Sequence, residues 1–228
     1  YNIQHTVTPN NGMLEVKLEC IRPDMEIHYT TDGSEPTATS PLYEKIVPVK
    51  EALTLKGAIF AHGRQMGKTL ILPVRWNLAT AKPVLGTNPT EKLLTNGIRG
   101  SLKYSDFEWC SWADNDSVSF TIDLLKPEVL NTLILGCITN NGMAIHKPAS
   151  VRVEVSDDNS KFREAVVQSF TSEEIFREGN FIENLSLKLG GTQARYVRVT
   201  AKGPGVCPAS HVRPGQTSRI FFDEVMLE

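Results

Sequence analysis

The sequence predicts an all-β protein built from sandwiches or barrels. Apolar and polar residues alternate with a period of two in several segments, which places the apolar side chains on one face of a half-buried strand. Dipeptides that favour backbone reversal, such as Asn11-Gly12, Asp32-Gly33 and Asn141-Gly142, stand between these segments. Short alternating segments separated by turn residues are typical of antiparallel sheets.

The alternation is clearest at residues 14–20, 118–124, 151–155 and 185–189, and each is expected as a strand with one solvated face. One stretch looks helical. Thr171 and Glu174 have the spacing of a capping box, but few apolar residues follow, so we expect only a helical turn within a loop.

Length and charge narrow the class of protein. The chain has 228 residues, 24 Lys+Arg against 26 Asp+Glu, a net charge of -2 and 40% hydrophobic positions, enough for two modest domains. The net charge and the lack of a long cluster of Lys and Arg give no electrostatic case for binding nucleic acid or an anionic membrane surface. No apolar run approaches the roughly 18 residues of a membrane-spanning helix. We therefore expect a soluble monomer with neither nucleic acid nor membrane as partner.

The chain begins at Tyr1 without a signal peptide, so we expect a piece of a longer protein whose localisation signal lies elsewhere. Its four cysteines, Cys20, Cys110, Cys137 and Cys207, show no Cys-x-x-Cys spacing, which argues against a structural zinc site. One long-range disulfide remains open, and isolated core thiols are the favoured interpretation.

A domain boundary is expected within residues 77–92. The predicted strand at residues 70–76 is followed by a stretch that holds Pro83, Gly86 and Pro89 and has no periodicity. We divide the chain into residues 1–78 and 79–228.

The first part contains a strand followed by a corner. Ile27 and Tyr29 share one strand face, and the segment Tyr-Thr-Thr-Asp-Gly-Ser-x-Pro follows, in which Asp32 is expected to bond backbone amides rather than act as a catalytic acid. His28 is expected on the solvated face. With Ser40-Pro41-Leu42-Tyr43 and the strand at residues 53–58, this corner resembles the chitobiase/β-hexosaminidase C-terminal domain over residues 5–76. The resemblance implies an immunoglobulin-like β-sandwich that accompanies glycoside hydrolase catalytic domains and has no chemistry of its own.

The second part carries an ordered series of motifs. They are Leu93 to Ser101, Trp109 and Trp112, residues 119–124, Lys147-Pro148, residues 153–158, residues 194–199 and Phe222 to Val225. This series resembles the coagulation-factor type C, or discoidin, domain over residues 79–228. The resemblance implies a β-jelly roll of the galactose-binding-domain-like kind, a group that includes family-32 carbohydrate-binding modules. The tail from Gly205 is similar to the version appended to bacterial family-20 β-N-acetylhexosaminidases. Asn96 replaces the usual Asp, and Ser210 stands where Trp is common.

The last strand predicts a candidate cation site. Both faces of residues 220–227 are largely apolar, so Asp223 or Glu224 must face the interior, where a carboxylate needs a partner or a metal. By the resemblance, a structural Ca²⁺ or Na⁺ would be held by the carbonyls of Leu93, Ile98 and Asp223, the Asn96 side chain, Ser101 and Glu224. These are the hard oxygen donors that calcium prefers, although Asn96 supplies no charge. The alternative is an ion pair between Glu224 and Arg or Lys.

Sugar recognition needs a flat apolar face beside directed hydrogen bonds, usually supplied by loops at one end of a jelly roll. Phe107 and Trp109 lie in one predicted loop, His146 in a second, and His211 with Arg213 in a third. We expect these side chains to converge on a carbohydrate. The alternative for Trp109 and the neighbouring Trp112 is burial as core residues, where most large aromatic side chains lie.

No catalytic constellation is evident. The paired acids Asp157-Asp158 and Asp223-Glu224 are chain neighbours, which point to opposite faces of a regular strand and so cannot clamp one glycosidic bond. No Gly-x-Ser-x-Gly, phosphate-binding loop or His-Glu-x-x-His occurs.

Together these features favour a non-catalytic C-terminal accessory region of a bacterial β-N-acetylhexosaminidase, or chitobiase. The expected partners are a glycan of the N-acetylhexosamine or galactose type and the catalytic domain of the same parent chain. The expected location is periplasmic, secreted or on the outer cell surface. A purely structural role is the main alternative. Adhesion or lipid binding is a third, which the low basic charge disfavours.

Overall fold

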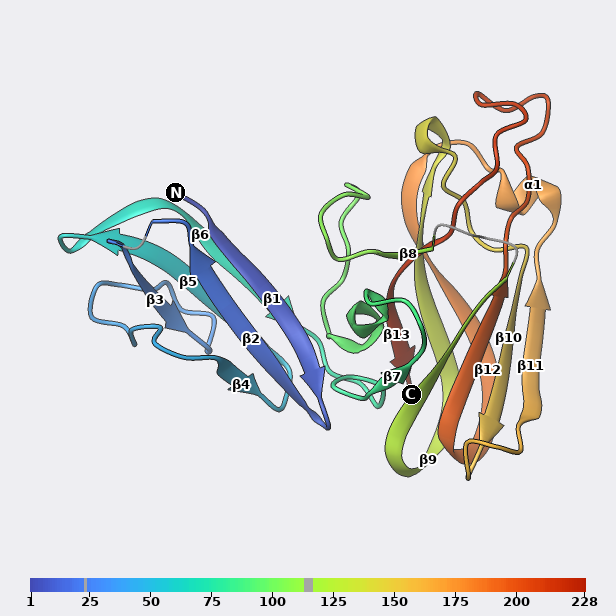
Figure 1. Cartoon of the computed structure of the whole chain (residues 1–228), viewed down its shortest axis with the longest axis horizontal. Helices are drawn as coiled ribbons and strands as arrows, with labels where there is room; N and C mark the ends of the chain where they lie inside the picture. The colour runs from blue at the N-terminus through green and yellow to red at the C-terminus, as the bar shows by residue number, and fades with distance from the viewer. Residues whose placement is uncertain (23, 113–116) are drawn as a thin grey trace.

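The computed structural model describes residues 1–22, 24–112 and 117–228 and contains two β modules (Figure 1). In the first module, β1 (Ile3–Asn10), β2 (Met13–Cys20) and β4 (Val47–Val49) form one three-stranded sheet. A second three-stranded sheet contains β3 (Glu26–Thr30), β5 (Leu53–Ala61) and β6 (Arg64–Val74). All pairings in both sheets are antiparallel.

Period-two alternation builds the core of this sandwich. Val16 and Leu18 on β2 are buried against Leu55 and Ile59 on β5, while the intervening Lys17 is exposed. The expected corner is present: Asp32 Oδ1 accepts hydrogen bonds from the backbone nitrogen of Ser34 at 3.0 Å and from its hydroxyl at 2.6 Å.

The second module is one seven-stranded sheet in the order β11-β10-β12-β9-β13-β8, with β7 paired to β9. Its strands are β7 (Val84–Leu85), β8 (Cys110–Ser111), β9 (Ser117–Asn140), β10 (Ser150–Ser156), β11 (Arg163–Ser169), β12 (Asn180–Lys202) and β13 (Phe221–Leu227). β9 and β12 pair along two stretches with an interruption between them, where Leu125, Gly190 and Gly191 have positive φ. Phe120 from the first stretch and Leu135 from the second are buried in one core, so the sheet encloses it from both sides.

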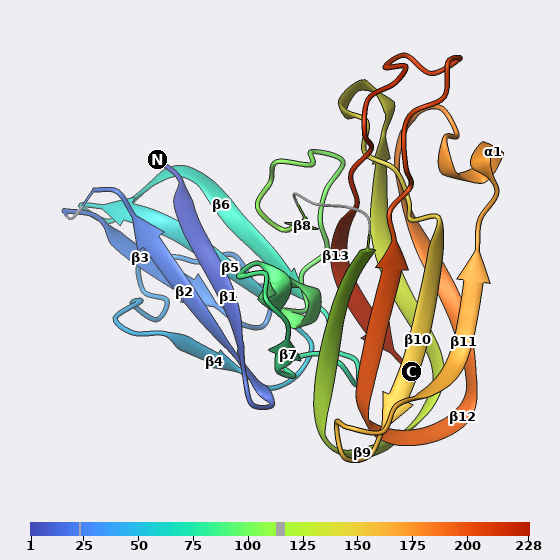
Figure 2. The same cartoon turned by 45° about the vertical axis from the view of Figure 1, so that its right-hand side comes forward.

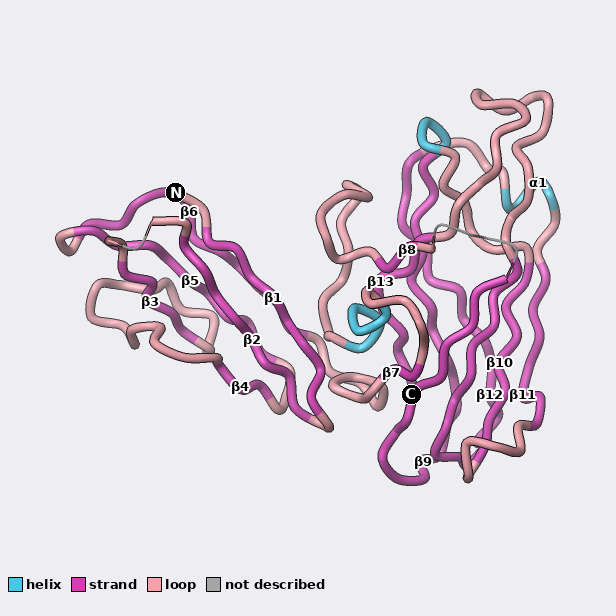
Figure 3. Tube along the Cα trace, viewed as in Figure 1, coloured by secondary structure: helices cyan, strands magenta, loops and turns pink. Residues whose placement is uncertain are grey.

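Short helices lie at the edges of this module. η1 (Glu91–Thr95) stands between the two modules, whereas η2 (Asn141–Met143) and α1 (Ser172–Ile175) lie at the end of the jelly roll where residues 203–219 also loop out (Figures 2 and 3). α1 begins with the expected capping box between Thr171 and Glu174. Among the described residues, no helix is long and apolar enough to cross a bilayer.

The two modules are packed against each other. Gly12 N donates to Ala81 O at 2.8 Å, and Arg75 N donates to Gly97 O at 2.8 Å. Ala81 and Ile98, which follow the last strand of the first module, are buried in that module's core. The segment between the modules is therefore part of their packing.

The all-β prediction of a sandwich followed by a jelly roll is confirmed, and all four cysteines are free thiols. The prediction for His28 is wrong, because its residue is only 7% exposed. The chain at residues 40–43 folds over β3, and His28 Nδ1 lies 2.7 Å from Ser40 O. The His28 ring also packs edge-on against Phe60.

Candidate functional site

Both acids of β13 are buried. Asp223 is 0% and Glu224 1% exposed, although neighbours on a regular strand would face opposite sides. The register of β13 on β9 shifts between Phe222 and Val225, and this bulge breaks the alternation that would have sent one acid outward.

The two carboxylates have different partners. Arg99 Nε donates to Asp223 Oδ2 at 2.6 Å, and Gly100 N donates to the same oxygen at 3.0 Å. The Glu224 oxygens accept from Gly97 N at 3.2 and 3.1 Å. Within the described parts of the chain, no Lys or Arg forms an ion pair with Glu224. Burial raises the pKa of Glu224 well above its usual value, and the charge of Asp223 adds to this shift.

A buried carboxylate without a cationic partner fits the predicted cation site. Asn96 is buried nearby, and its Oδ1 accepts from Ile98 N at 2.9 Å while Nδ2 donates to Glu108 Oε2 at 3.1 Å. The Leu93 carbonyl lies 3.4 Å from Asn96 N. Ser101 is exposed; its backbone nitrogen donates to Asp106 and its carbonyl accepts from Trp109. Ser101 therefore has the weakest structural support among the predicted ligands.

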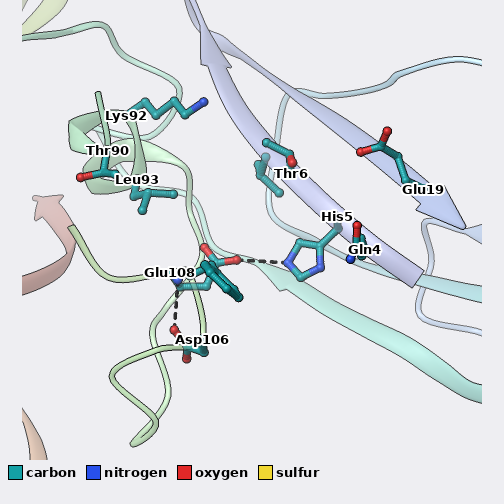
Figure 4. A pocket seen from close by; sticks show the side chains of 11 residues that line it. Gln4, His5, Thr6, Glu19, Thr90, Lys92, Leu93, Asp106 and Glu108 are labelled. Atoms are coloured by element: carbon teal, nitrogen blue, oxygen red, sulfur yellow. Dashed lines mark hydrogen bonds and ion pairs between the residues drawn. The ribbon is translucent and has the colours of Figure 1, made fainter. Parts of the chain in front are cut away.

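A cleft of about 500 Å³ lies between the modules (Figure 4). His5 Nε2 lies 3.1 Å from Glu108 Oε1 and joins β1 to the loop before β8 across this cleft. The remaining lining residues come from both modules and are mostly polar: Gln4, Thr6, Val7, Glu19, Thr90, Lys92, Leu93, Asp106 and Phe107.

Phe107 is the most open apolar side chain of this cleft. It is 89% exposed, and its φ of 70° is an uncommon value for a bulky residue. Asp106 fixes the loop, because its carboxylate accepts from Ser101 N at 2.6 Å and from Glu108 N at 3.0 Å. A loop held from both sides presents the Phe107 ring to solvent.

Trp109, two residues further, has the opposite placement. It is 5% exposed and packs with Ile138 and Phe221, while its Nε1 donates to Ser101 O at 3.1 Å. Trp112 is partly buried and packs against Phe120 and Phe222. The Trp109 indole is enclosed in the core and offers no open face for sugar stacking, which corrects the expectation that Trp109 faces a ligand.

The three later residues of the predicted sugar site meet at the loop end of the jelly roll. His146 Nε2 lies 3.1 Å from His211 Nε2, and Arg213 N donates to His211 Nδ1 at 3.0 Å. His146 is 0% and His211 9% exposed, whereas Arg213 is exposed and donates to the Gly142 carbonyl. The structure thus brings His146, His211 and Arg213 together and leaves Phe107 at a different surface.

The sequence did not predict several residues that line the cleft between the modules and the pocket at the loop end. Gln4 and Glu19 belong to the first module, and only the packing of the two modules brings them near Lys92. At the loop end, Asn141 and Phe176 line a pocket of about 120 Å³ beside His211. No spacing in the sequence links these positions.

The fold and clefts define a two-module β-sandwich and jelly-roll protein with a ligand-sized cleft between the modules. Residues 79–212 match the model of the F5/8 type C domain, so the chain belongs to the F5/8 type C domain family. Residues 9–70 match the model of the chitobiase/beta-hexosaminidase C-terminal domain. Both resemblances noted in the sequence are thereby confirmed.

Solved structures that match part of this chain include a family-32 carbohydrate-binding module from Clostridium perfringens, with TM-score 0.43 and 18% identity over 67% of this chain and 98% of that one. A fucose-binding module from Streptococcus pneumoniae has TM-score 0.41 and 18% identity over 67% and 97% of the two chains. The C-terminal domain of a chitobiase from Bacteroides fragilis has TM-score 0.34 and 16% identity over 57% and 76%. A comparison with curated proteins gives no match.

Proposed function

We propose that this chain is a glycan-binding accessory region and that the cleft between its modules holds the sugar. The observation that carries this proposal is Phe107, whose ring is 89% exposed on a loop fixed by hydrogen bonds. An apolar ring held open beside polar groups is the chemistry that stacks on the C–H face of a pyranose.

The polar lining of the cleft suits the other face of a sugar. Gln4 offers an amide, Glu19 a carboxylate and Lys92 an ammonium group, and all three side chains are exposed. Hydroxyls and an N-acetyl group both donate and accept hydrogen bonds, so this mixture matches an N-acetylhexosamine or a galactose-type sugar. The cleft volume of about 500 Å³ accommodates a short oligosaccharide.

The match of residues 9–70 to the chitobiase/beta-hexosaminidase C-terminal domain supports the wider context. We propose that the region acts as a monomer beside the catalytic domain of a family-20 β-N-acetylhexosaminidase in the same chain. Such an enzyme would meet its glycan in the periplasm, on the cell surface or outside the bacterium. The accessory region would hold the catalytic domain near that glycan without breaking bonds itself.

We further propose a structural Ca²⁺, or Na⁺, at Glu224. The burial of this carboxylate without a cationic partner among the described residues supports the assignment. Asn96 and the carbonyls of Leu93, Ile98 and Asp223 are the further proposed donors, and Ser101 the outermost. The cation would supply the positive charge that Glu224 lacks. Calcium should raise the melting temperature of the wild type, and Glu224→Gln should abolish this increase.

Titration of the 228-residue chain with N-acetylglucosamine, galactose and their oligomers tests the glycan assignment. We expect Phe107→Ala to weaken binding about tenfold or more, and Lys92→Ala to weaken it less. Arg213→Ala at the loop end is the matched control and should bind as the wild type does. If Arg213→Ala loses binding and Phe107→Ala does not, the glycan binds at the loop end and the cleft assignment is wrong. Absence of binding at millimolar sugar would leave the purely structural role.

A further inference from the structure

Three metal-binding side chains meet at the loop end of the jelly roll. His146 follows η2, and Cys207 and His211 belong to the loop between β12 and β13. One ligand atom from each lies within 4.8 Å of the other two, and the Nε2 atoms of His146 and His211 are 3.1 Å apart. His146, Cys207 and His211 are 0%, 3% and 9% exposed, so all three residues are buried.

One buried polar atom of this cluster lacks a hydrogen-bond partner among the described residues. His146 Nδ1 faces the backbone of Ile175 but makes no hydrogen bond of normal geometry within the described part of the chain. Cys207 is a free thiol whose Sγ lies 3.3 Å from Ser218 Oγ. Phe176 packs edge-on against both imidazoles, with ring centroids at 5.1 and 6.1 Å. Burying two imidazoles and a thiol beside an aromatic ring is costly unless something compensates them.

We propose that His146, Cys207 and His211 form a binding site for a borderline-soft divalent cation, best matched by Zn²⁺. Thiolate and imidazole are the ligands that zinc takes in proteins, at about 2.3 Å for sulfur and about 2.0–2.1 Å for nitrogen. In a tetrahedron of these bond lengths the two nitrogens lie about 3.3 Å apart and nitrogen and sulfur about 3.6 Å. The observed nitrogen separation of 3.1 Å is close to this geometry, and the sulfur of Cys207 must move inward by about 1.2 Å at most.

Binding rearranges two protons. The Cys207 thiol releases its proton to solvent as the sulfur–zinc bond forms. Both nitrogens of His211 face donors: Arg213 N lies 3.0 Å from Nδ1, and Asn141 Nδ2 lies 3.2 Å from Nε2. A neutral imidazole can accept at only one of its two nitrogens, so the other contact is not a hydrogen bond of the ring as it stands. Coordination through Nε2 requires the ring proton on Nδ1, so it breaks the contact of Nδ1 with Arg213 N and displaces the Asn141 amide from Nε2. Residues 212–217 are exposed, so this turn can shift, and a hydrogen bond is exchanged for a stronger metal–nitrogen bond.

The fourth coordination position is open. The pocket beside His211, about 120 Å³ and lined by Asn141 and Phe176, has room for water as the remaining ligand. The ion would link η2 and the segment after it to the loop between β12 and β13. These two segments are already joined by the hydrogen bond from His146 N to Arg219 O, by that from Arg213 Nε to the Gly142 carbonyl, and by the contact of Asn141 with His211. Zinc would therefore stiffen the loop end of the module.

The test uses the 228-residue chain, stripped of metal and titrated with Zn²⁺ and with Co²⁺. We expect one ion per chain and, with Co²⁺, an absorption band from sulfur-to-metal charge transfer. Cys207→Ser and His211→Asn should each weaken Zn²⁺ binding about 100-fold or more, a larger loss than an outer-sphere residue produces. Cys20→Ser and His62→Asn, the same changes at the half-buried Cys20 and exposed His62 of the first module, are the matched controls and should bind normally.

Three results would overturn the proposal: no bound Zn²⁺ in the folded wild type, binding that survives Cys207→Ser, or a Co²⁺ complex without the charge-transfer band. Melting curves of the metal-free variants show whether each is folded before it is titrated. Glu224→Gln separates this site from the proposed calcium site, because it should leave the Co²⁺ band unchanged. Cys207→Ser should bind glycan as the wild type does. The zinc proposal and the sugar-site proposal can therefore fail independently of each other.

Discussion

Arg99 and Asp223 form a buried ion pair that fastens the segment after η1 to the last strand. Arg99 Nε donates to Asp223 Oδ2 at 2.6 Å, and the side chains are 17% and 0% exposed. Gly136 on the neighbouring strand makes room for the acid, since a Cβ at that position would lie 1.9 Å from Asp223 Oδ1. The missing side chain of Gly136 thus lets Asp223 lie inside the sheet.

Arg99→Met should be strongly destabilising, because it leaves the Asp223 carboxylate buried without its cation. We expect a loss of about 3–5 kcal/mol in the free energy of unfolding, measured by urea denaturation. The double variant Arg99→Met with Asp223→Asn should recover part of this loss, because it removes the unpaired charge. If Arg99→Met lowers the free energy of unfolding by less than about 1 kcal/mol, the ion pair is not needed for stability.

Gly100→Ala should displace the indole of Trp109. A Cβ on Gly100 would lie 2.3 Å from Trp109 Cε2, and the indole is confined by the core around it. We expect the free energy of unfolding to fall by about 1–3 kcal/mol and the tryptophan fluorescence to change. Gly142→Ala is the control, since its Cβ would meet only Asn140 Oδ1 at 3.5 Å. Equal stability of the two variants would contradict the proposed packing.

The sequence predicts the strands better than it predicts the site. Period-two alternation locates the strands because one face of each packs on a core, and this holds for β2 and the first half of β9. It fails at Asp223 and Glu224, where a bulge that no local pattern marks sends both acids inward. The prediction for His28 fails for a different reason, because the loop at residues 40–43 covers it and the alternation within its own strand does not record that loop.

The proposed ligand sites depend on contacts between distant segments. His5 and Glu108 meet across the two modules, and His146 meets His211 through two separate loops. Residue types alone mark such positions as polar or aromatic without showing which of them share a cleft. Trp109 illustrates the limit: the same aromatic side chain suits a sugar platform or a core, and its burial follows from packing with Ile138 and Phe221.

Thiol labelling of the metal-free native protein should modify one cysteine quickly. Cys20 is half-buried, whereas the other three are buried, and burial raises the pKa of Cys110 to about 12. Burial also raises the pKa of Cys137. We expect a disulfide reagent at about pH 8 to react with Cys20 in the native chain and with all four thiols in denaturant. Cys20→Ser should abolish the fast reaction, and rapid native labelling of Cys110 would contradict its placement.

Asp123 and Arg195 form a bidentate pair between β9 and β12. Arg195 Nε and Nη2 donate to the two carboxylate oxygens at 2.8 and 2.9 Å, and Leu125 N donates to Oδ1 at 2.8 Å. The Arg195 hydrogen bonds lower the pKa of Asp123 below its usual 3.8, although burial opposes the shift. Because the folded pKa is depressed, the pair's stabilisation is fully present above the unfolded pKa and is lost as pH falls through the folded value.

Asp123→Asn should therefore lower the free energy of unfolding by about 1–2 kcal/mol near neutral pH, since the amide cannot reproduce the charged bidentate contact. The difference between wild type and variant should stay constant down to about pH 5 and shrink at lower pH, because only the wild-type carboxylate is then protonated. Urea denaturation at a series of pH values measures this difference. The exposed Asp24 provides the control Asp24→Asn, which should match the wild type throughout. A gap for Asp123→Asn that widens in acid would reverse the inferred sign of the pKa shift and contradict the pairing with Arg195.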